Sequence, residues 1–147
     1  MKSEEIWTQL YDKGINIGLD LFNPLQKHLF YFIDFVYSVE MEGISGFLYN
    51  KSPTIFGENN FQPYIDSLCF FNQRKLSILI REFNNKYQDI FKSQEKELTA
   101  MTTDEFYRKL GLSEITKEIK CLVNKVLTEH INDIMIWIDE NKVELLN

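Results

Sequence analysis

Two histidines and two closely spaced glutamates are the residues of this sequence whose types could carry acid–base chemistry. Glu40 and Glu42 are two positions apart, so on a helix they point to different sides and do not form a carboxylate pair. His28 and His130 belong to no cluster with metal-ligand spacing. The sequence therefore predicts no catalytic residue, no metal site and no cofactor. The alternative is an enzyme whose fold gathers Glu40, Glu42 and His28 into one site.

Motifs for phosphate or acyl chemistry are missing from the sequence. It contains neither a GxGxxG nor a GxxxxGK[ST] pattern, and the segment from Gly43 to Gly46 lacks the lysine of a phosphate loop. No GxSxG is found, so a hydrolase nucleophile elbow is not supported. The sequence therefore favours a binding surface over a catalytic site.

An acidic stripe follows the last predicted helix, opposite its apolar face. At about 100° and 1.5 Å per residue the stripe extends roughly 33 Å, and Lys125 interrupts it. Two interpretations remain open: a solvated helix face, or a surface for a basic protein partner. Ile136 falls on the acidic side, which indicates cover by a partner or a second subunit. The predicted partner-binding residues are Glu114, Glu118, Glu129, Asp133, Asp139 and Glu140.

Composition limits the classes of protein that fit. The 147 residues are 44% hydrophobic and 14% aromatic, which suits a single globular domain spanning residues 1–147. The net charge of −6 disfavours direct binding of nucleic acid. No apolar run approaches the roughly 18 residues of a membrane span, and the N-terminal segment does not read as a secretion signal. Cys69 and Cys121 are expected in the core of a cytoplasmic protein.

The elements that must position these residues are helices. A first helix is predicted from Ser3 to about Lys13, ended by Gly14. Asn23 as N-cap, Pro24 at the first position and Gln26 in a capping box open a central apolar helix, predicted to end at Gly43.

Residues 50–63 are rich in Asn, Gly and Pro and are predicted to form a loop. Helical periodicity resumes at Tyr64, Asn72 is a candidate N-cap for the next helix, and residues 88–100 are predicted as a short helix or loop. Ser113 is predicted to cap a final helix reaching about Asp139. The fold class is therefore all-α, a compact bundle of about five to seven helices with a long C-terminal helix.

The segment VEMEGISGFLYNKSP, residues 39–53, is interpreted as a structural corner. Gly43 is predicted to end the central helix in a left-handed cap, and Gly46 to let Phe47 turn back into the core. Tyr49 and Asn50 are predicted to fasten the turn. Pro53, the last residue of the segment, is expected to prevent the helix from resuming.

The same segment resembles a family of small all-helical bacterial proteins named for a DNA-mimic protein. The family motif is roughly a glutamate, a short spacer, Asn-Gly-Gly-Phe, aromatic residues and an asparagine. Ile44 and Ser45 depart from this motif. The residues that match are Gly46, Phe47, Tyr49 and Asn50, with Glu40 or Glu42 in the acidic role.

The resemblance implies an all-α, often dimeric protein that presents carboxylates to a DNA-binding protein. Three classes of function remain open from the sequence. The first is a non-catalytic acidic module that binds a basic or DNA-binding protein, with a homodimer as a candidate assembly. The second is an immunity or inhibitor protein that neutralises a toxin. The third is the enzyme considered above.

Overall fold

A computed structural model of the chain describes residues 1–55, 61–99, 105, 108 and 113–147, without the side chains of residues 45–46, 48–55 and 87–99. Every regular element in these ranges is helical, and no strand occurs there, which confirms the all-α prediction. The helices are α1 (Ser3–Ile17), α2 (Pro24–Ile55), α3 (Gln62–Phe70), α4 (Arg74–Thr99), α6 (Ser113–Lys125), η1 (Val126–His130), α7 (Ile131–Glu140) and α8 (Lys142–Leu146).

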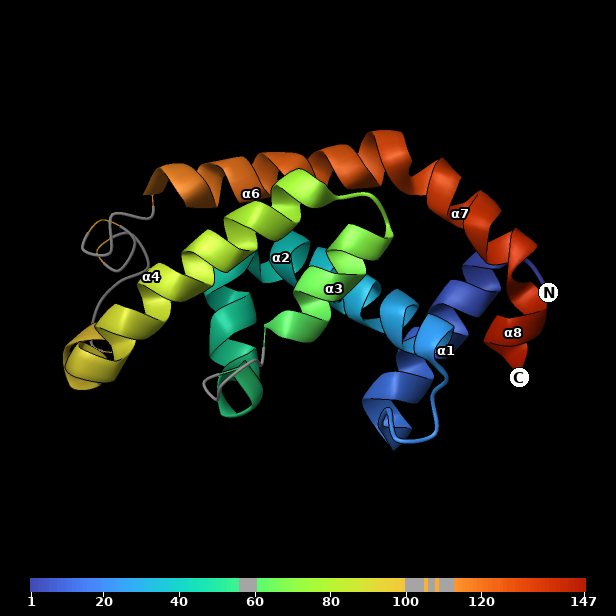
Figure 1. The fold of residues 1–147 in the computed structure, drawn as a ribbon, viewed down its shortest axis with the longest axis horizontal. Coiled ribbons are helices and arrows are strands. Elements are labelled where there is room, and N and C mark those ends of the chain that lie inside the picture. Colours follow the sequence, from blue (N-terminus) through green and yellow to red (C-terminus); the bar gives the residue numbers. More distant parts are fainter. Residues whose placement is uncertain (56–60, 100–104, 106–107, 109–112) are drawn as a thin grey trace.

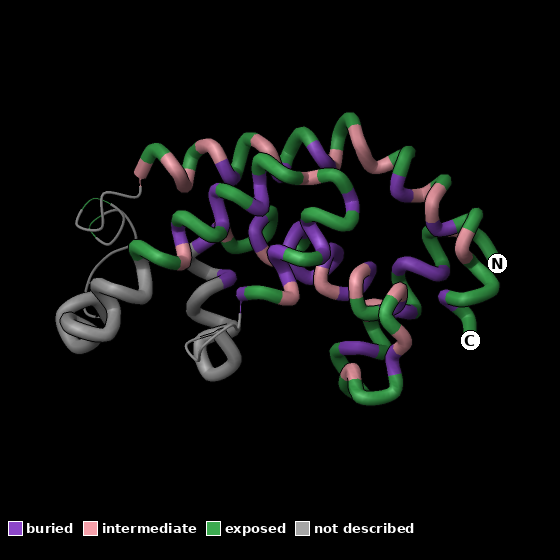
Figure 2. The backbone as a smooth tube through the Cα atoms, viewed as in Figure 1, coloured by how far each residue is buried: buried purple, intermediate pink, exposed green. Residues whose placement is uncertain are grey.

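Helix α2 is the centre of the fold, in contact with α1, α3, α6 and α8 (Figure 1). Its apolar residues recur around much of its circumference, so that several neighbouring helices can bury them. Figure 2 shows the buried residues on the inner sides of the helices. The buried apolar residues of the first part of α2 are Leu29, Phe30, Phe32, Ile33, Phe35, Val36 and Val39.

The predicted start of α2 is confirmed by a reciprocal capping box. The Asn23 backbone N–H donates to Oε1 of Gln26 at 2.9 Å, and the Gln26 N–H donates to Oδ1 of Asn23 at 2.9 Å. The side-chain amides of the same two residues then reach α8. Asn23 Nδ2 donates to the Glu144 carbonyl at 2.8 Å, and Gln26 Nε2 donates to the Leu145 carbonyl at 3.0 Å. One motif therefore caps α2 and fastens the C-terminal segment.

The expected corner at Gly43 is a kink inside a longer helix. Gly43 has φ 72° and ψ 176°, which is not the left-handed helical conformation predicted for a cap. The helix resumes directly after it and continues to Ile55, so the prediction of a loop from residue 50 and of a stop at Pro53 was wrong for residues 50–55. Residues 56–60 of the predicted loop lie outside the described residues.

Other predicted boundaries also shift. Helix α1 continues past Gly14 to Ile17 and ends at Gly18, which has φ 95°, whereas Gly14 is buried and lies close to the Phe30 ring. Asn72, predicted as an N-cap, has φ 60° and closes α3: its N–H donates to the Cys69 carbonyl, and the next N–H donates to the Leu68 carbonyl. This is a Schellman motif with asparagine in the usual glycine position. Helix α4 reaches Thr99, so residues 88–99, predicted as a short helix or loop, are part of a long helix.

The long C-terminal helix is confirmed, with a π-helical turn in its middle. Segments α6, η1 and α7 follow one another from Ser113 to Glu140 along one edge of the molecule (Figure 1). A π-helical turn inserts one extra residue, which is worth about 100° of rotation. In an uninterrupted helix Asp133 would lie only about 40° from the buried Ile119, and Ile138 about 100° away. The extra residue turns Ile138 into the core and Asp133 outward.

The core contains neither cysteine. Cys69 and Cys121 are both exposed and both free, which corrects the prediction that they are small core residues. Within the described part of the chain, no helix is long and apolar enough to cross a membrane.

Candidate functional site

The six carboxylates of the predicted acidic stripe lie along α6, η1 and α7. Five of them are exposed, whereas Glu118 is half-buried where α6 contacts α4. The opposite side of the same segments is buried, with Ile119, Val123 and Val126 before the π-helical turn or within it. The helix therefore presents these acids to solvent, and the side chains around them determine how much of their charge is available.

Lysines neutralise four of the six carboxylates. Lys75 of α4 lies 2.9 Å from Oε1 of Glu118, an ion pair between two helices. The other three pairs are local to the long helix and its end, and their side chains are largely exposed, so each contributes little to stability. They are Lys117–Glu114 at 3.7 Å, Lys125–Glu129 at 3.9 Å and Lys142–Asp139 at 3.2 Å.

Asp133 and Glu140 are the two stripe residues without an ion pair among the described residues. They stand three positions before and four positions after Ile136, the spacing that places side chains on one face of a helix. Ile136 is 56% exposed, so an apolar side chain lies in the open between two unpaired carboxylates. We call Asp133, Ile136 and Glu140 the α7 patch.

The family-motif residues lie around the kink of α2. Glu40 and Glu42 are exposed just before Gly43, whereas Phe47 is fully buried after it. The Phe47 ring contacts Phe35 and Tyr64 edge-on, with centroids 5.5 and 5.1 Å apart. The backbone of Gly46, Tyr49 and Asn50 is helical within α2, so the turn predicted at Gly46 does not occur and Phe47 reaches the core from within the helix. The side chains of Tyr49 and Asn50, predicted to fasten that turn, lie outside the described part.

The structure does not bring the residues of the alternative enzyme site together. His28 and Glu40 are twelve positions apart in one helical segment, about 18 Å along its axis. His28 instead stacks on Phe70, with centroids 4.3 Å apart and planes 9° from parallel, and its Nδ1 lies 3.4 Å from Oγ of Ser67. Burial lowers the pKa of the His28 imidazole, and nearby Asp66 partly opposes this shift.

The second histidine also has a structural contact. His130, the last residue of the π-helical turn, has Nδ1 3.2 Å from Nε2 of Gln73 in the α3–α4 connection. No group of three or more His, Cys, Asp or Glu side chains that could hold a metal ion occurs in the described part of the chain.

A buried carboxylate that was not among the predicted site residues lies in the core. Asp34 is 1% exposed and accepts a hydrogen bond from the Tyr64 hydroxyl at 2.7 Å and one from the Tyr11 hydroxyl at 3.4 Å. Burial first, and the Asp34 charge second, raise the pKa values of Tyr64, Tyr11 and Tyr31. The signal was available, because an aspartate interrupting the most apolar helix needs buried donors around it.

In the comparison with known protein families, the model of the family described as DMP19-like protein matches residues 20–141, from the α1–α2 connection to the end of α7. Comparison with curated proteins and with solved structures gives no significant match.

Proposed function

We propose that this chain, which belongs to the family of DMP19-like proteins, is a non-catalytic interaction module that binds a basic protein. The α7 patch is the observation that best supports this function. Asp133 and Glu140 are exposed carboxylates without a cation beside them among the described residues, and they flank the exposed Ile136. A complementary surface would carry two cationic side chains around an apolar one.

The partner we propose is a DNA-binding protein, which would place this chain in the cytoplasm. A surface that binds DNA phosphates already carries exposed lysines and arginines, so it can also bind exposed carboxylates. Family membership supports this class of partner, since the family takes its name from DNA mimic protein 19.

The remaining stripe residues are assigned to the edge of this interface. Glu114, Glu118, Glu129 and Asp139 each lie within ion-pair distance of a lysine, so their charge is partly compensated before any partner arrives. The field along the long helix is therefore weaker than the count of acids indicates. We expect affinity to come mainly from the α7 patch, with the edge acids raising the association rate.

Competition with DNA tests this function. Proteins that bind a duplex-DNA column are eluted with salt, returned to low salt and passed over the immobilised chain. We expect a retained protein that added duplex DNA releases, and we expect Asp133→Lys with Glu140→Lys to abolish retention.

A matched control separates the patch from net charge. Asp20→Lys with Glu82→Lys changes the charge equally, in the α1–α2 connection and on α4, and should retain the partner. Retention that survives reversal of the patch, or that duplex DNA does not affect, contradicts the proposal.

A further inference from the structure

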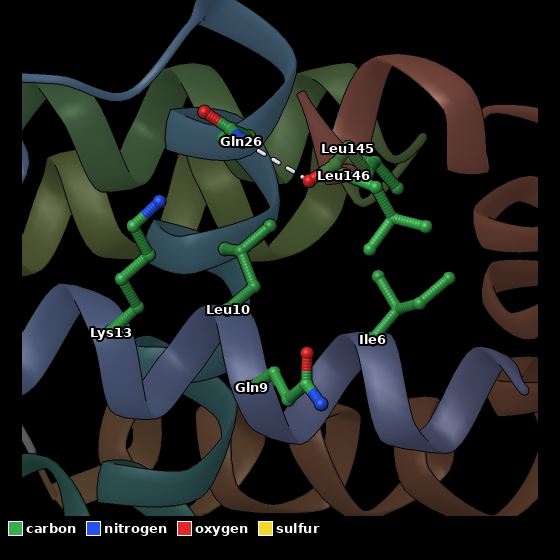
Figure 3. Close-up of a pocket in the computed structure, with 7 residues that line it drawn as sticks. All are labelled: Ile6, Gln9, Leu10, Lys13, Gln26, Leu145 and Leu146. Atoms are coloured by element: carbon green, nitrogen blue, oxygen red, sulfur yellow. Dashed lines mark hydrogen bonds between the residues drawn. The ribbon is translucent and has the colours of Figure 1, made fainter. Parts of the chain in front are cut away.

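A pocket outside the acidic face lies between α1, the start of α2 and α8 (Figure 3). Its volume is about 150 Å³. One wall is aliphatic, with Ile6 and Leu10 of α1 facing Leu145 and Leu146 across the opening. The pocket is open to solvent, unlike the closed apolar cavity of about this volume that holds benzene, so a ligand of about five carbon atoms would stay partly exposed there.

The other end of the pocket is polar. Gln9, Lys13 and Gln26 contribute their side chains to the lining, and in Figure 3 the Lys13 ammonium lies at the same end as the Gln26 amide. Gln26 is committed to the capping box and to α8, so it shapes the pocket and its amide is already hydrogen-bonded.

No carboxylate among the described residues forms an ion pair with Lys13. Its Nζ lies 5.6 Å from the centroid of the Phe22 ring. An ammonium beside an apolar cavity is complementary to a molecule with a negative head and an aliphatic tail.

We propose that this pocket binds a small aliphatic carboxylate, whose head pairs with Lys13 and whose branched tail of about five carbons packs on Ile6, Leu10 and Leu146. This site is separate from the α7 patch. The family match begins at residue 20 and ends at residue 141, so Gln26 is the one lining residue inside it. The lining therefore comes mainly from α1 and α8.

Titration with 4-methylpentanoate, followed by amide chemical shifts, tests the proposal. We expect saturable binding with the largest shifts at Lys13, Leu145 and Leu146. Lys13→Met should weaken binding about three- to fivefold, the effect of removing a solvent-exposed ion pair. Lys120→Met, at an exposed position of α6, is the matched control and should leave the affinity unchanged.

Two further measurements make the result decisive. The neutral 4-methylpentanamide should bind more weakly than the carboxylate, and Lys13→Glu should invert the preference toward 3-methylbutylamine. Because Lys13 is exposed, these variants leave the core intact. Shifts that do not saturate, equal affinity for the amide and the carboxylate, or unchanged affinity of Lys13→Met would each overturn the proposal. The α7 patch plays no part in this titration, so its outcome is independent of the proposed function.

Discussion

Asp34 shows how one polar side chain can organise an apolar core. It lies on α2 and accepts hydrogen bonds from tyrosines of α1 and α3, so three helices meet at one carboxylate. A buried charge is tolerated when donors satisfy it, and losing a donor or the charge then costs more than a typical surface change. The position therefore fixes the arrangement of α1 and α3 on α2.

Asp34→Asn tests this role. The amide keeps the shape of the side chain but removes the charge that strengthens the 2.7 Å bond from Tyr64. We expect the free energy of unfolding in urea to fall by about 1.5–3 kcal/mol. Tyr11→Phe, which removes a longer bond of 3.4 Å, is the comparison and should cost about 0.5–1 kcal/mol. Equal stability of Asp34→Asn and the unchanged protein would contradict this role.

The same cluster predicts how stability depends on alkaline pH. Burial, the Asp34 charge and the Asp34 hydrogen bond raise the pKa of Tyr11 from 10.0 to about 12, and the pKa of Tyr64 rises for the same reasons. Above pH 10 the unfolded chain releases these protons first, so the folded state holds more protons and stability falls as pH rises. Urea unfolding followed between pH 9 and 12 should show this decline, and Asp34→Asn should make it shallower, because burial, the largest cause, remains. A profile that is level across this window would disprove the assignment.

At the scale of elements, two glycines act for different reasons. Gly43 is required for its backbone conformation, because φ 72° with ψ 176° lies in a region that residues other than glycine rarely adopt. Gly14 supplies space, because a Cβ built there would lie 2.3 Å from Cδ2 of Phe30. The two positions therefore respond differently to substitution.

Replacing Gly43 separates a kink from a helix cap. Alanine there would meet no atom within 4 Å, so its cost is backbone strain alone, about 1–3 kcal/mol in the free energy of unfolding. Asparagine often replaces glycine in a left-handed cap, yet here it should cost as much as alanine because ψ is extended. Urea denaturation of both variants measures this, and a stable Gly43→Asn protein would restore the cap interpretation.

Gly14→Ala should destabilise the contact between α1 and α2. Alanine favours a helix by up to about 1 kcal/mol over glycine, but overpacking against the buried Phe30 costs about 1–3 kcal/mol. We expect a net loss in thermal stability. Asn16→Ala, at an exposed position of the same helix, gains propensity without the clash and should be neutral or slightly stabilising. A more stable Gly14→Ala protein would show that Phe30 moves aside freely.

Local signals explain which elements were predictable. The capping box at Asn23 and Gln26 was recognised because side chains three positions apart satisfy the helix N-terminus wherever the helix packs. Residues 50–55 of α2 were predicted as a loop, and residues 88–100 only as a short helix or loop, because their composition is that of a polar connection. The π-helical turn leaves no distinctive sequence signal, since the register that it corrects is set by packing against other helices.

The candidate site was predicted in part. Asp133 and Glu140 were predicted on the exposed face and are exposed, but this exposure depends on the π-helical turn, because in an uninterrupted helix Asp133 would lie about 40° from the buried Ile119. Neutralisation of Glu118 by Lys75 could not be predicted, because the lysine comes from α4, 43 positions earlier in the chain. The α1–α8 pocket could not be predicted either, since it combines the two ends of the sequence.

At the scale of the whole molecule, the long helix joins two groups of contacts. Segment α6 packs on α2 and α4, whereas α7 packs on α1 (Figure 1). The π-helical turn between them allows both segments to bury their apolar sides, with Ile119 and Val123 on one side of the turn and Ile134 and Ile138 on the other.

Deleting the exposed Thr128 should restore a regular helix and keep the facing of α7. The π-helical turn accommodates one extra residue, so after the deletion Ile138 lies a whole number of turns from Ile119 at about 100° per residue, and it stays buried while Asp133 stays exposed. We expect the free energy of unfolding to change little, whereas deleting Glu129 as well should rotate α7 by about 100°, carry Ile134 and Ile138 out of the core and lower the free energy of unfolding by about 3–6 kcal/mol. Thr128→Ala, which keeps the length, is the control for differential scanning calorimetry. A melting temperature of the single deletion far below that of Thr128→Ala would show that α7 does not keep its facing when the extra residue is removed.

The capping box that reaches α8 has a consequence for how the molecule opens. Helix α8 spans five residues and buries one side chain, Leu145. Its detachment therefore exposes little apolar surface to solvent. When it detaches, the two hydrogen bonds from backbone N–H groups to side-chain oxygens between Asn23 and Gln26 remain, and α2 keeps its first turn. We therefore expect the amides of α8 to exchange with solvent hydrogen much faster than those at the start of α2, through a sub-global opening that leaves the central helix protected.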